Sequence, residues 1–187
     1  MGKKILIWLA GGVLTVILLG ALGVVAFFEF AKHAVAKNLR APELTRSFTN
    51  GADFAYTTFD GETRHVSELK GKVVFVNIWG TWCAPCVAEM PAIQKLYENF
   101  KHDPSVQFVI ASRLDSPARV KSYAERNHYD LPFDTIRDED IPASMQFNQY
   151  PSTFIYAKDG SLAFHHIQAA NWADQSVILF INKLKDQ

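Results

Sequence analysis

The sequence predicts an α/β domain with a mixed central sheet that is flanked by helices and preceded by an N-terminal transmembrane helix. Three observations lead to this prediction: a charge-free apolar stretch at residues 5–28, a strand–helix–strand succession in mid-chain, and two hairpin turns marked by Asp-Gly pairs. A strand–helix–strand unit implies parallel neighbouring strands, whereas a hairpin joins antiparallel ones. A sheet that contains both kinds of pairing is mixed.

The apolar stretch at residues 5–28 is long enough to cross a bilayer as a helix, which takes about 20 residues. A cleaved signal peptide is the alternative, because Lys3 and Lys4 precede the stretch and residues 34–36 resemble a cleavage site. The apolar part of a signal peptide is usually only about 7–15 residues long. We therefore expect a retained anchor, and we divide the chain into residues 1–4, 5–28, 29–49 and 50–187 as tail, anchor, linker and domain.

The charges flanking the stretch do not set its orientation, because Lys and Arg stand near both of its ends. Disulfide chemistry is most useful outside the cytoplasm. We therefore expect a single-pass protein of the inner membrane, with residues 1–4 in the cytoplasm and the domain on the periplasmic, extracytoplasmic side. The 187-residue chain has a formal net charge of zero and no basic run, so nucleic acid is not an expected partner.

The elements of the domain follow from local patterns, in chain order. The segments 55–58 and 63–66 flank Asp60-Gly61, a strong hairpin signal. The apolar, β-branched run at 73–78 predicts a strand covered on both faces. From residue 84 to about 100, apolar residues recur at spacings of three and four and predict a helix. A second strand, a capped helix, a hairpin around Asp159-Gly160 and a closing helix are predicted at 106–111, 116–127, 153–167 and 177–184.

Cys83 and Cys86 are the only two cysteines, and their C-x-x-C spacing predicts dithiol–disulfide chemistry. Structural zinc usually needs four ligands, and no second cysteine pair is present. Haem attachment needs a His directly after the second Cys, where the chain has Val87. A purely structural disulfide closing so short a loop would remove little chain entropy. Redox chemistry is therefore the favoured interpretation.

These residues resemble a known family, the membrane-anchored thioredoxin-like thiol–disulfide oxidoreductases of the TlpA/ResA type. The resemblance extends from about residue 54 to the C-terminus, and it is weakest between about 113 and 144. Its most specific parts are Trp82-Cys83-Ala84-Pro85-Cys86, then Glu89-Met90-Pro91, and Tyr150-Pro151-Ser152-Thr153-Phe154. The resemblance implies a thioredoxin-like fold, an extracytoplasmic location and a mostly reducing role, for example in cytochrome c maturation.

The roles of the cysteines follow from their place at a strand-to-helix junction. Free backbone N–H groups and the helix dipole favour a thiolate at Cys83, so we assign it as the attacking cysteine. Cys86, one turn later and more buried, resolves the mixed disulfide. Glu89 lies three residues beyond Cys86, and there it either exchanges a proton with Cys86 or is a solvated surface glutamate. The resemblance favours the catalytic role.

Other residues near the motif receive assignments as well. Pro151 resembles the cis-proline that faces the cysteines in this family, and the resemblance implies a substrate groove formed by Trp82, Pro85, Tyr150 and Pro151. We interpret Asn77 as a buried, hydrogen-bonded amide and Trp79 as a core residue. His165 and His166 alternate along a strand and cannot form one metal site. No metal or cofactor is predicted.

The predicted partners are protein thiols and disulfides, together with a membrane dithiol protein as electron donor, because no nucleotide-binding glycine motif is present. Three alternatives remain. The same site serves a disulfide oxidase or isomerase equally well. A tethered binding or chaperone module for apo-proteins would have only a structural disulfide. A thiol peroxidase fits poorly, because the chain has no other thiol.

Overall fold

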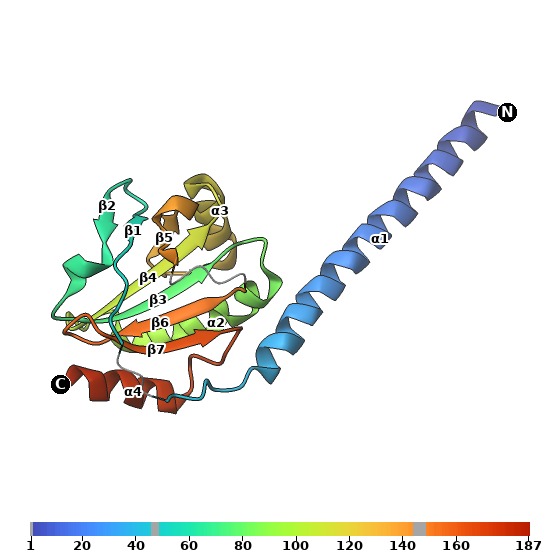
Figure 1. Cartoon of the computed structure of the whole chain (residues 1–187). Helices are drawn as coiled ribbons and strands as arrows, with labels where there is room; N and C mark the ends of the chain where they lie inside the picture. The colour runs from blue at the N-terminus through green and yellow to red at the C-terminus, as the bar shows by residue number, and fades with distance from the viewer. Residues whose placement is uncertain (1, 46–48, 144–148) are drawn as a thin grey trace. The chain divides into compact units, whose positions relative to one another are not determined.

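The computed structural model describes residues 2–45, 49–143 and 149–187 (Figure 1). The chain divides into two compact units, Met1–Asn38 and Leu39–Gln187. The first is the helix α1 (Gly2–Asn38), and the large apolar side chains described between Val13 and Phe27 are exposed on it. Among the described residues, no helix has both the length and the apolar character that a membrane crossing requires. The transmembrane anchor expected at residues 5–28 is therefore not shown by the structure.

The second unit is built on one mixed sheet, which has seven strands within the described ranges, in the order β2-β1-β5-β4-β3-β6-β7. Strands β3, β4 and β5 are parallel, whereas β6 and β7 and the hairpin β1–β2 pair antiparallel. The strands are Ala55–Thr57, Thr63–His65, Val73–Trp79, Val106–Arg113, Phe133–Ile136, Ser152–Tyr156 and Leu162–Ile167, for β1 to β7. This thioredoxin-like arrangement confirms the predicted mixed sheet.

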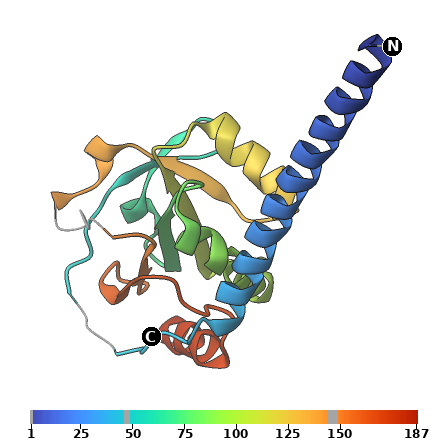
Figure 2. The same cartoon turned by 90° about the vertical axis from the view of Figure 1, so that its right-hand side faces the viewer.

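Three helices cover one face of the sheet: α2 (Ala84–Phe100), α3 (Pro117–Asn127) and α4 (Gln175–Lys185). These helices are drawn in green, yellow and red, from α2 to α4, in Figure 2. Their apolar residues share one hydrophobic cluster with Phe75, Phe108 and Phe164 of the sheet. A second hydrophobic cluster lies on the opposite face, and it includes Tyr56 of β1 and Val66 of the short 3-10 helix η1 (Val66–Leu69). Strand β3 is buried along its whole length, as its largely apolar sequence predicts, and Asn77 is its one polar residue.

Strand β5 (Phe133–Ile136) was not predicted from the sequence. It has only four residues, and Asp134 interrupts its apolar pattern, although the carboxylate is buried. Its parallel pairing with β4 links the hairpin β1–β2 to the rest of the sheet. A second 3-10 helix, η2 (Asp138–Asp140), follows β5 directly.

Candidate active site

The two cysteines lie where strand β3 ends and helix α2 begins. Cys83 is the N-cap residue of α2, and its Sγ accepts a hydrogen bond from the backbone N–H of Cys86 at 3.3 Å. Cys83 and Cys86 form a disulfide whose Cα atoms are 5.3 Å apart. Cys86 is completely buried and Cys83 is 6% exposed. The prediction that Cys86 is the more buried cysteine is confirmed.

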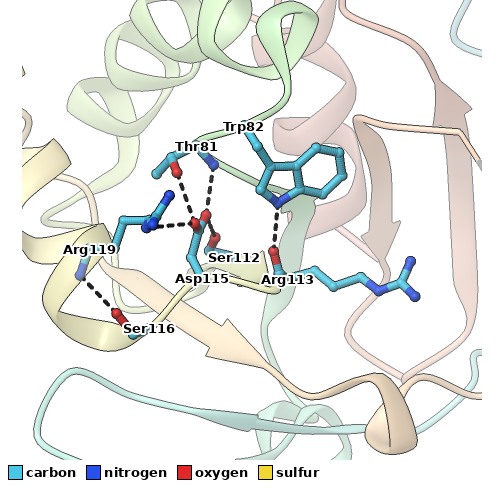
Figure 3. Close-up of polar contacts among 7 residues, drawn as sticks. All are labelled: Thr81, Trp82, Ser112, Arg113, Asp115, Ser116 and Arg119. Carbon is cyan, nitrogen blue, oxygen red and sulfur yellow. Dashed lines mark hydrogen bonds and ion pairs between the residues drawn. The ribbon is translucent and has the colours of Figure 1, made fainter.

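Trp82 covers the turn that carries Cys83. Its indole N–H donates to the carbonyl oxygen of Arg113 at 3.1 Å, and the residue remains 49% exposed (Figure 3). The indole lies so close to Gly80 that a Cβ there would be 2.4 Å from Nε1. Only glycine allows this approach, which keeps an exposed aromatic surface beside Cys83.

The loop before strand β6 lies beside the cysteine turn, because β6 pairs with β3 and places Ser152 opposite Ile78. The Tyr150–Pro151 peptide bond is cis, which confirms the prediction made from the resemblance. The ring of Tyr150 meets that of Trp82 edge-on, with centroids 5.6 Å apart. Trp82 and Tyr150 are therefore grouped at one surface, with the buried Pro151 directly after Tyr150, whereas Pro85 is exposed on the first turn of α2.

Arg113, at the end of β4, is part of the same surface and was not assigned to the site from the sequence. Its guanidinium forms two hydrogen bonds to the carboxylate of Asp138, at 2.6 and 3.0 Å. It also bonds the hydroxyl of Tyr150 and lies 5.4 Å from the centroid of that ring. Arg113 thus ties Trp82, through its own carbonyl, to Tyr150 and to the helix η2.

Glu89 is completely buried on helix α2, so the alternative of a solvated surface glutamate is wrong. Its Oε2 accepts hydrogen bonds from the indole N–H of Trp172 at 2.6 Å and from the backbone N–H of Ala170 at 3.0 Å. Its Oε1 accepts one from Asn77 at 2.8 Å. Burial raises the pKa of Glu89 to about 7, although these three hydrogen bonds oppose the rise. A carboxyl with this pKa can gain or lose a proton near neutral pH.

Asn77 connects Glu89 to the loop of the cis-proline. Its amide also donates to the hydroxyl of Thr153 at 2.9 Å, and Thr153 lies two residues after Pro151. The interpretation of Asn77 as a buried, hydrogen-bonded amide is confirmed. Trp172 was missed because it belongs to no motif and enters the site from the loop before α4.

Asp115 was also missed, although it holds the turn that precedes Cys83 (Figure 3). Its carboxylate accepts hydrogen bonds from the backbone N–H and the hydroxyl of Thr81 and from the hydroxyl of Ser112, at 2.7, 2.8 and 2.7 Å. One signal in the sequence pointed towards it. The predicted helix start at residue 116 places Asp115 after the carboxyl end of β4, the sheet edge that also carries Cys83.

Trp79 and the two adjacent histidines lie as the sequence predicts. Trp79 is fully buried in the core. His165 stacks on Phe154 in one hydrophobic cluster, and His166 meets Trp172 in the other, so the two imidazoles face opposite sides of the sheet. Within the part of the chain that the structure describes, no cluster of His, Cys, Asp and Glu has the arrangement of a metal site.

Comparison with known proteins gives a consistent result. Residues 49–165 match the model of the AhpC/TSA family. The thioredoxin-like protein YneN of Bacillus subtilis is 32% identical over 164 residues, which cover 86% of this chain and 89% of that protein. The thiol-disulfide oxidoreductase ResA of Geobacillus kaustophilus is 31% identical over 148 residues, 78% of this chain and 79% of that protein.

A solved structure gives the same fold. The thiol:disulfide interchange protein of the thioredoxin family from Chlorobium tepidum superposes with a TM-score of 0.58 at 22% identity, covering 75% of this chain and 95% of that one. With the cysteine pair at the start of α2 and the matches to YneN and ResA, the chain belongs to the AhpC/TSA family, as a thioredoxin-like thiol–disulfide oxidoreductase of the ResA type.

Proposed function

We propose that this oxidoreductase reduces disulfides in protein substrates outside the cytoplasm, for example during cytochrome c maturation, through the dithiol of Cys83 and Cys86. The observation that carries the proposal is the pairing of this disulfide with Glu89, a buried carboxyl that lies one turn further along the same helix and has a pKa of about 7. A disulfide with only a structural role needs no titratable group in an apolar interior. Dithiol exchange needs such a titratable group, because Cys86 must lose a proton before it attacks.

The reaction begins from the reduced protein. The Cys83 thiolate attacks one sulfur of the substrate disulfide, so a bond forms between Cys83 and that sulfur while the substrate S–S bond breaks and its other sulfur leaves as a thiolate. Cys86 then attacks the Sγ of Cys83. The intramolecular disulfide forms, the mixed disulfide breaks, and the second substrate thiolate is released. The substrate gains two electrons, and the Cys83–Cys86 pair loses them.

The proton balance of the second step involves Glu89. The thiol of Cys86 is completely buried, and its proton must be accepted within the protein before the sulfur becomes a nucleophile. We assign this acceptor to the Glu89 carboxylate, which returns the proton to Cys86 when the disulfide is reduced again. Three hydrogen bonds stabilise the carboxylate, and burial stabilises the acid, so both forms are accessible near neutral pH.

We assign substrate binding to the surface formed by Trp82, Pro85, Tyr150 and Pro151. The half-exposed indole of Trp82 offers apolar contact directly beside Cys83. An extended substrate segment would bind next to the cis-proline loop through its own backbone. The edge-on contact between Trp82 and Tyr150 supports a common role for these side chains.

We further propose that α1 anchors the protein in the inner membrane, with the domain on the periplasmic side. The charge-free sequence of residues 5–28 and the exposed apolar side chains described along α1 support this assignment. A membrane dithiol protein would then supply electrons. Protease treatment of intact spheroplasts tests the topology, because a domain outside the cytoplasm is digested, whereas a cytoplasmic domain survives and contradicts the proposal.

The experiment that tests the exchange function is to trap the mixed disulfide. In the Cys86→Ser variant, Cys83 attacks but no resolving thiol remains. We expect covalent complexes with extracytoplasmic proteins that are released by dithiothreitol, and none from Cys83→Ser. If Cys86→Ser forms no such complex, the protein does not exchange disulfides with proteins.

The direction of exchange is tested by the reduction potential of the Cys83–Cys86 couple, measured against glutathione. A value at or below about −230 mV, towards that of thioredoxin, agrees with a reductant that needs an electron supply. A value near about −120 mV, as in strong oxidants, would assign the protein as an oxidase and overturn the reducing role while leaving the site unchanged.

A further inference from the structure

Asp115 links three parts of the active-site edge through one buried carboxylate. Only 1% of its side chain is exposed. It accepts hydrogen bonds from Thr81, in the turn after β3, and from Ser112, at the end of β4, and it forms a longer ion pair of 3.7 Å with Arg119 of α3 (Figure 3). Hydrogen bonds to an ionised acceptor are about twice as strong as neutral ones. None of these contacts is needed by the exchange chemistry itself.

We infer that Asp115 is a positioning residue that holds the turn from Gly80 to Cys83, and so keeps the Cys83 sulfur against the N-terminus of helix α2. This inference rests on the proposed function, because it concerns the thiolate that performs the attack. Thr81 is two residues before Cys83, and both of its side-chain and backbone donors are directed to Asp115. The turn is closed by a hydrogen bond of 3.1 Å from the Cys83 N–H to the Gly80 carbonyl.

The position of the Cys83 sulfur matters because thiolate stabilisation at a helix end is short-ranged. The backbone N–H of Cys86 contacts Sγ at 3.3 Å, and the effect of the helix dipole is confined to the first turn. If the turn before Cys83 moves, Sγ leaves the N–H groups that favour its charged form. A hydrogen-bonded carboxylate below the turn prevents that movement.

The backbone next to Asp115 is itself held in an unusual conformation. Leu114 has a φ of 63°, in the left-handed region, and its side chain is 69% exposed. A leucine rarely adopts this region, because its Cβ comes too close to the backbone, and it does so only where its surroundings determine it. Here the neighbours on both sides are engaged, because the Arg113 carbonyl accepts from Trp82 and the Asp115 carboxylate accepts from Thr81.

A positioning role of Asp115 and a direct effect of its charge predict opposite shifts in the pKa of the Cys83 thiol when Asp115 is replaced. The negative charge of Asp115 by itself disfavours a nearby thiolate, so removing the charge would make the thiolate easier to form. Loss of the turn has the opposite consequence, because Sγ then leaves the N–H groups at the start of α2 and the thiolate becomes harder to form. Asp115→Asn removes the charge but keeps hydrogen bonding, because the Thr81 hydroxyl can reverse and accept from the new amide. Asp115→Ala removes the charge and the hydrogen bonds together.

The experiment measures the pH profile of iodoacetamide alkylation in the full-length Cys86→Ser protein, where Cys83 is the only thiol. We expect Asp115→Ala to move the midpoint of the profile upward by about one pH unit, so that about tenfold less thiolate is present below it. Asp115→Asn should leave the midpoint unchanged or lower it. If both variants lower the midpoint, or if neither changes it, the positioning role is wrong.

Thr81→Val provides a second variant if Asp115→Ala does not fold. It keeps the charge and the backbone hydrogen bond but loses the hydroxyl, so we expect a smaller upward shift. An unchanged midpoint in Thr81→Val would contradict the inference. Arg119, Arg113 and Glu89, the charged groups on the neighbouring elements, are the same in every variant.

Asp103→Ala is the matched control. Asp103 lies before the opposite end of β4 and has an equivalent set of partners: the Ser105 N–H at 2.9 Å, the Ser105 hydroxyl at 2.6 Å and Lys185 at 2.6 Å. Its loss should leave the alkylation profile of Cys83 unchanged. An upward shift equal to that of Asp115→Ala would show a general effect of destabilisation and overturn the inference.

The alkylation experiment is independent of the proposed function. If Cys86→Ser traps no substrate but Asp115→Ala shifts the profile upward, the exchange function fails and the positioning role stands. If substrates are trapped and the profile does not move, the positioning role alone fails.

Discussion

At the scale of single residues, Glu89 shows how an apolar environment changes a carboxyl group. The residue is completely buried, and desolvation raises its pKa to about 7 against three hydrogen bonds that favour the carboxylate. Asp134, in β5, is a second buried carboxyl whose pKa is raised by burial to about 7. The two lie against opposite faces of the sheet, because Glu89 belongs to α2 and Asp134 shares the face of Ile136. Only Glu89 shares a helix with the cysteines.

The first prediction concerns Glu89→Gln. We expect the rate of thiol–disulfide exchange to fall by about a hundredfold and to lose its dependence on a group with a pKa near 7, because Cys86 then lacks its proton acceptor. Gln can still accept hydrogen bonds from Trp172 and Ala170, so the fold should persist. Stopped-flow kinetics of the reduced protein with a disulfide substrate, over a range of pH, measures the effect.

Asp134→Asn is the control for that prediction, because it removes the other buried carboxyl of similar pKa without touching the cysteine helix. Its pH–rate profile should match that of the wild type. A profile that is unchanged in Glu89→Gln would remove Glu89 from the mechanism.

At the scale of elements, the ends of β3 and β4 and the start of β6 meet at one edge of the sheet. Arg113 joins them, since its carbonyl holds Trp82 and its guanidinium contacts both Tyr150 and Asp138. The guanidinium is 25% exposed and its Asp138 partner 49%, so this ion pair contributes little to the stability of the fold. Its effect should be on the shape of the substrate surface.

The second prediction follows from this arrangement. Arg113→Met should raise KM for a protein disulfide substrate by about two- to fivefold, the equivalent of an exposed ion pair of up to about 1 kcal/mol, and leave kcat nearly unchanged. Steady-state kinetics with a protein substrate and with a small disulfide separates the two effects. The small disulfide should show no change, because it does not need the extended surface.

The matched control is Arg137→Met, which removes ion pairs with Glu139 and Asp140 in the adjacent helix η2. It should leave KM for both substrates unchanged. An equal rise of KM in Arg137→Met, or an effect of Arg113→Met on the small disulfide, would contradict a substrate-positioning role for Arg113.

At the scale of the whole molecule, two buried carboxyls make the stability of the domain depend on pH. Each has a folded-state pKa of about 7, against ordinary values of 4.5 for Glu and 3.8 for Asp. Between those values the folded state binds more protons than the unfolded state. The contribution of these two groups to the free energy of unfolding therefore decreases as the pH rises from about 4 to about 7. Two sets of groups act in the opposite direction. Burial lowers the pKa of His165 and of His166, which add stability as the pH rises towards 6.5, and Asp103, with a pKa lowered to about 2, acts only in stronger acid.

The third prediction is that the midpoint of urea unfolding is higher at about pH 5 than at about pH 8. Since one pKa unit corresponds to about 1.4 kcal/mol, each carboxyl contributes on the order of 3 kcal/mol at most. The double variant Glu89→Gln, Asp134→Asn should have a much flatter dependence. If the wild type and the double variant depend on pH to the same extent, the two carboxyls are ionised in the folded protein without penalty.

Much of the fold was predictable because it depends on local patterns. The apolar run of β3, the three-and-four spacing of α2 and the Asp-Gly turns each report on a few neighbouring residues. Strand β5 was not predictable in this way, because four residues containing a buried Asp134 form a strand only when β4 supplies a pairing edge. At the site, the spacing of the two cysteines predicted their chemistry. The family resemblance predicted the cis-proline and favoured the role of Glu89.

The sequence by itself determined which residues can do chemistry: two cysteines at helical spacing, and a glutamate one turn beyond them. Tertiary structure alone decided how that glutamate is tuned, because Trp172, Ala170 and Asn77 reach it from other elements. It also decided how the turn before Cys83 is held, through Asp115, which lies 34 residues from Thr81. Hydrogen bonds and desolvation act over a few ångströms in space, whatever the separation along the chain, and a linear pattern does not contain those distances.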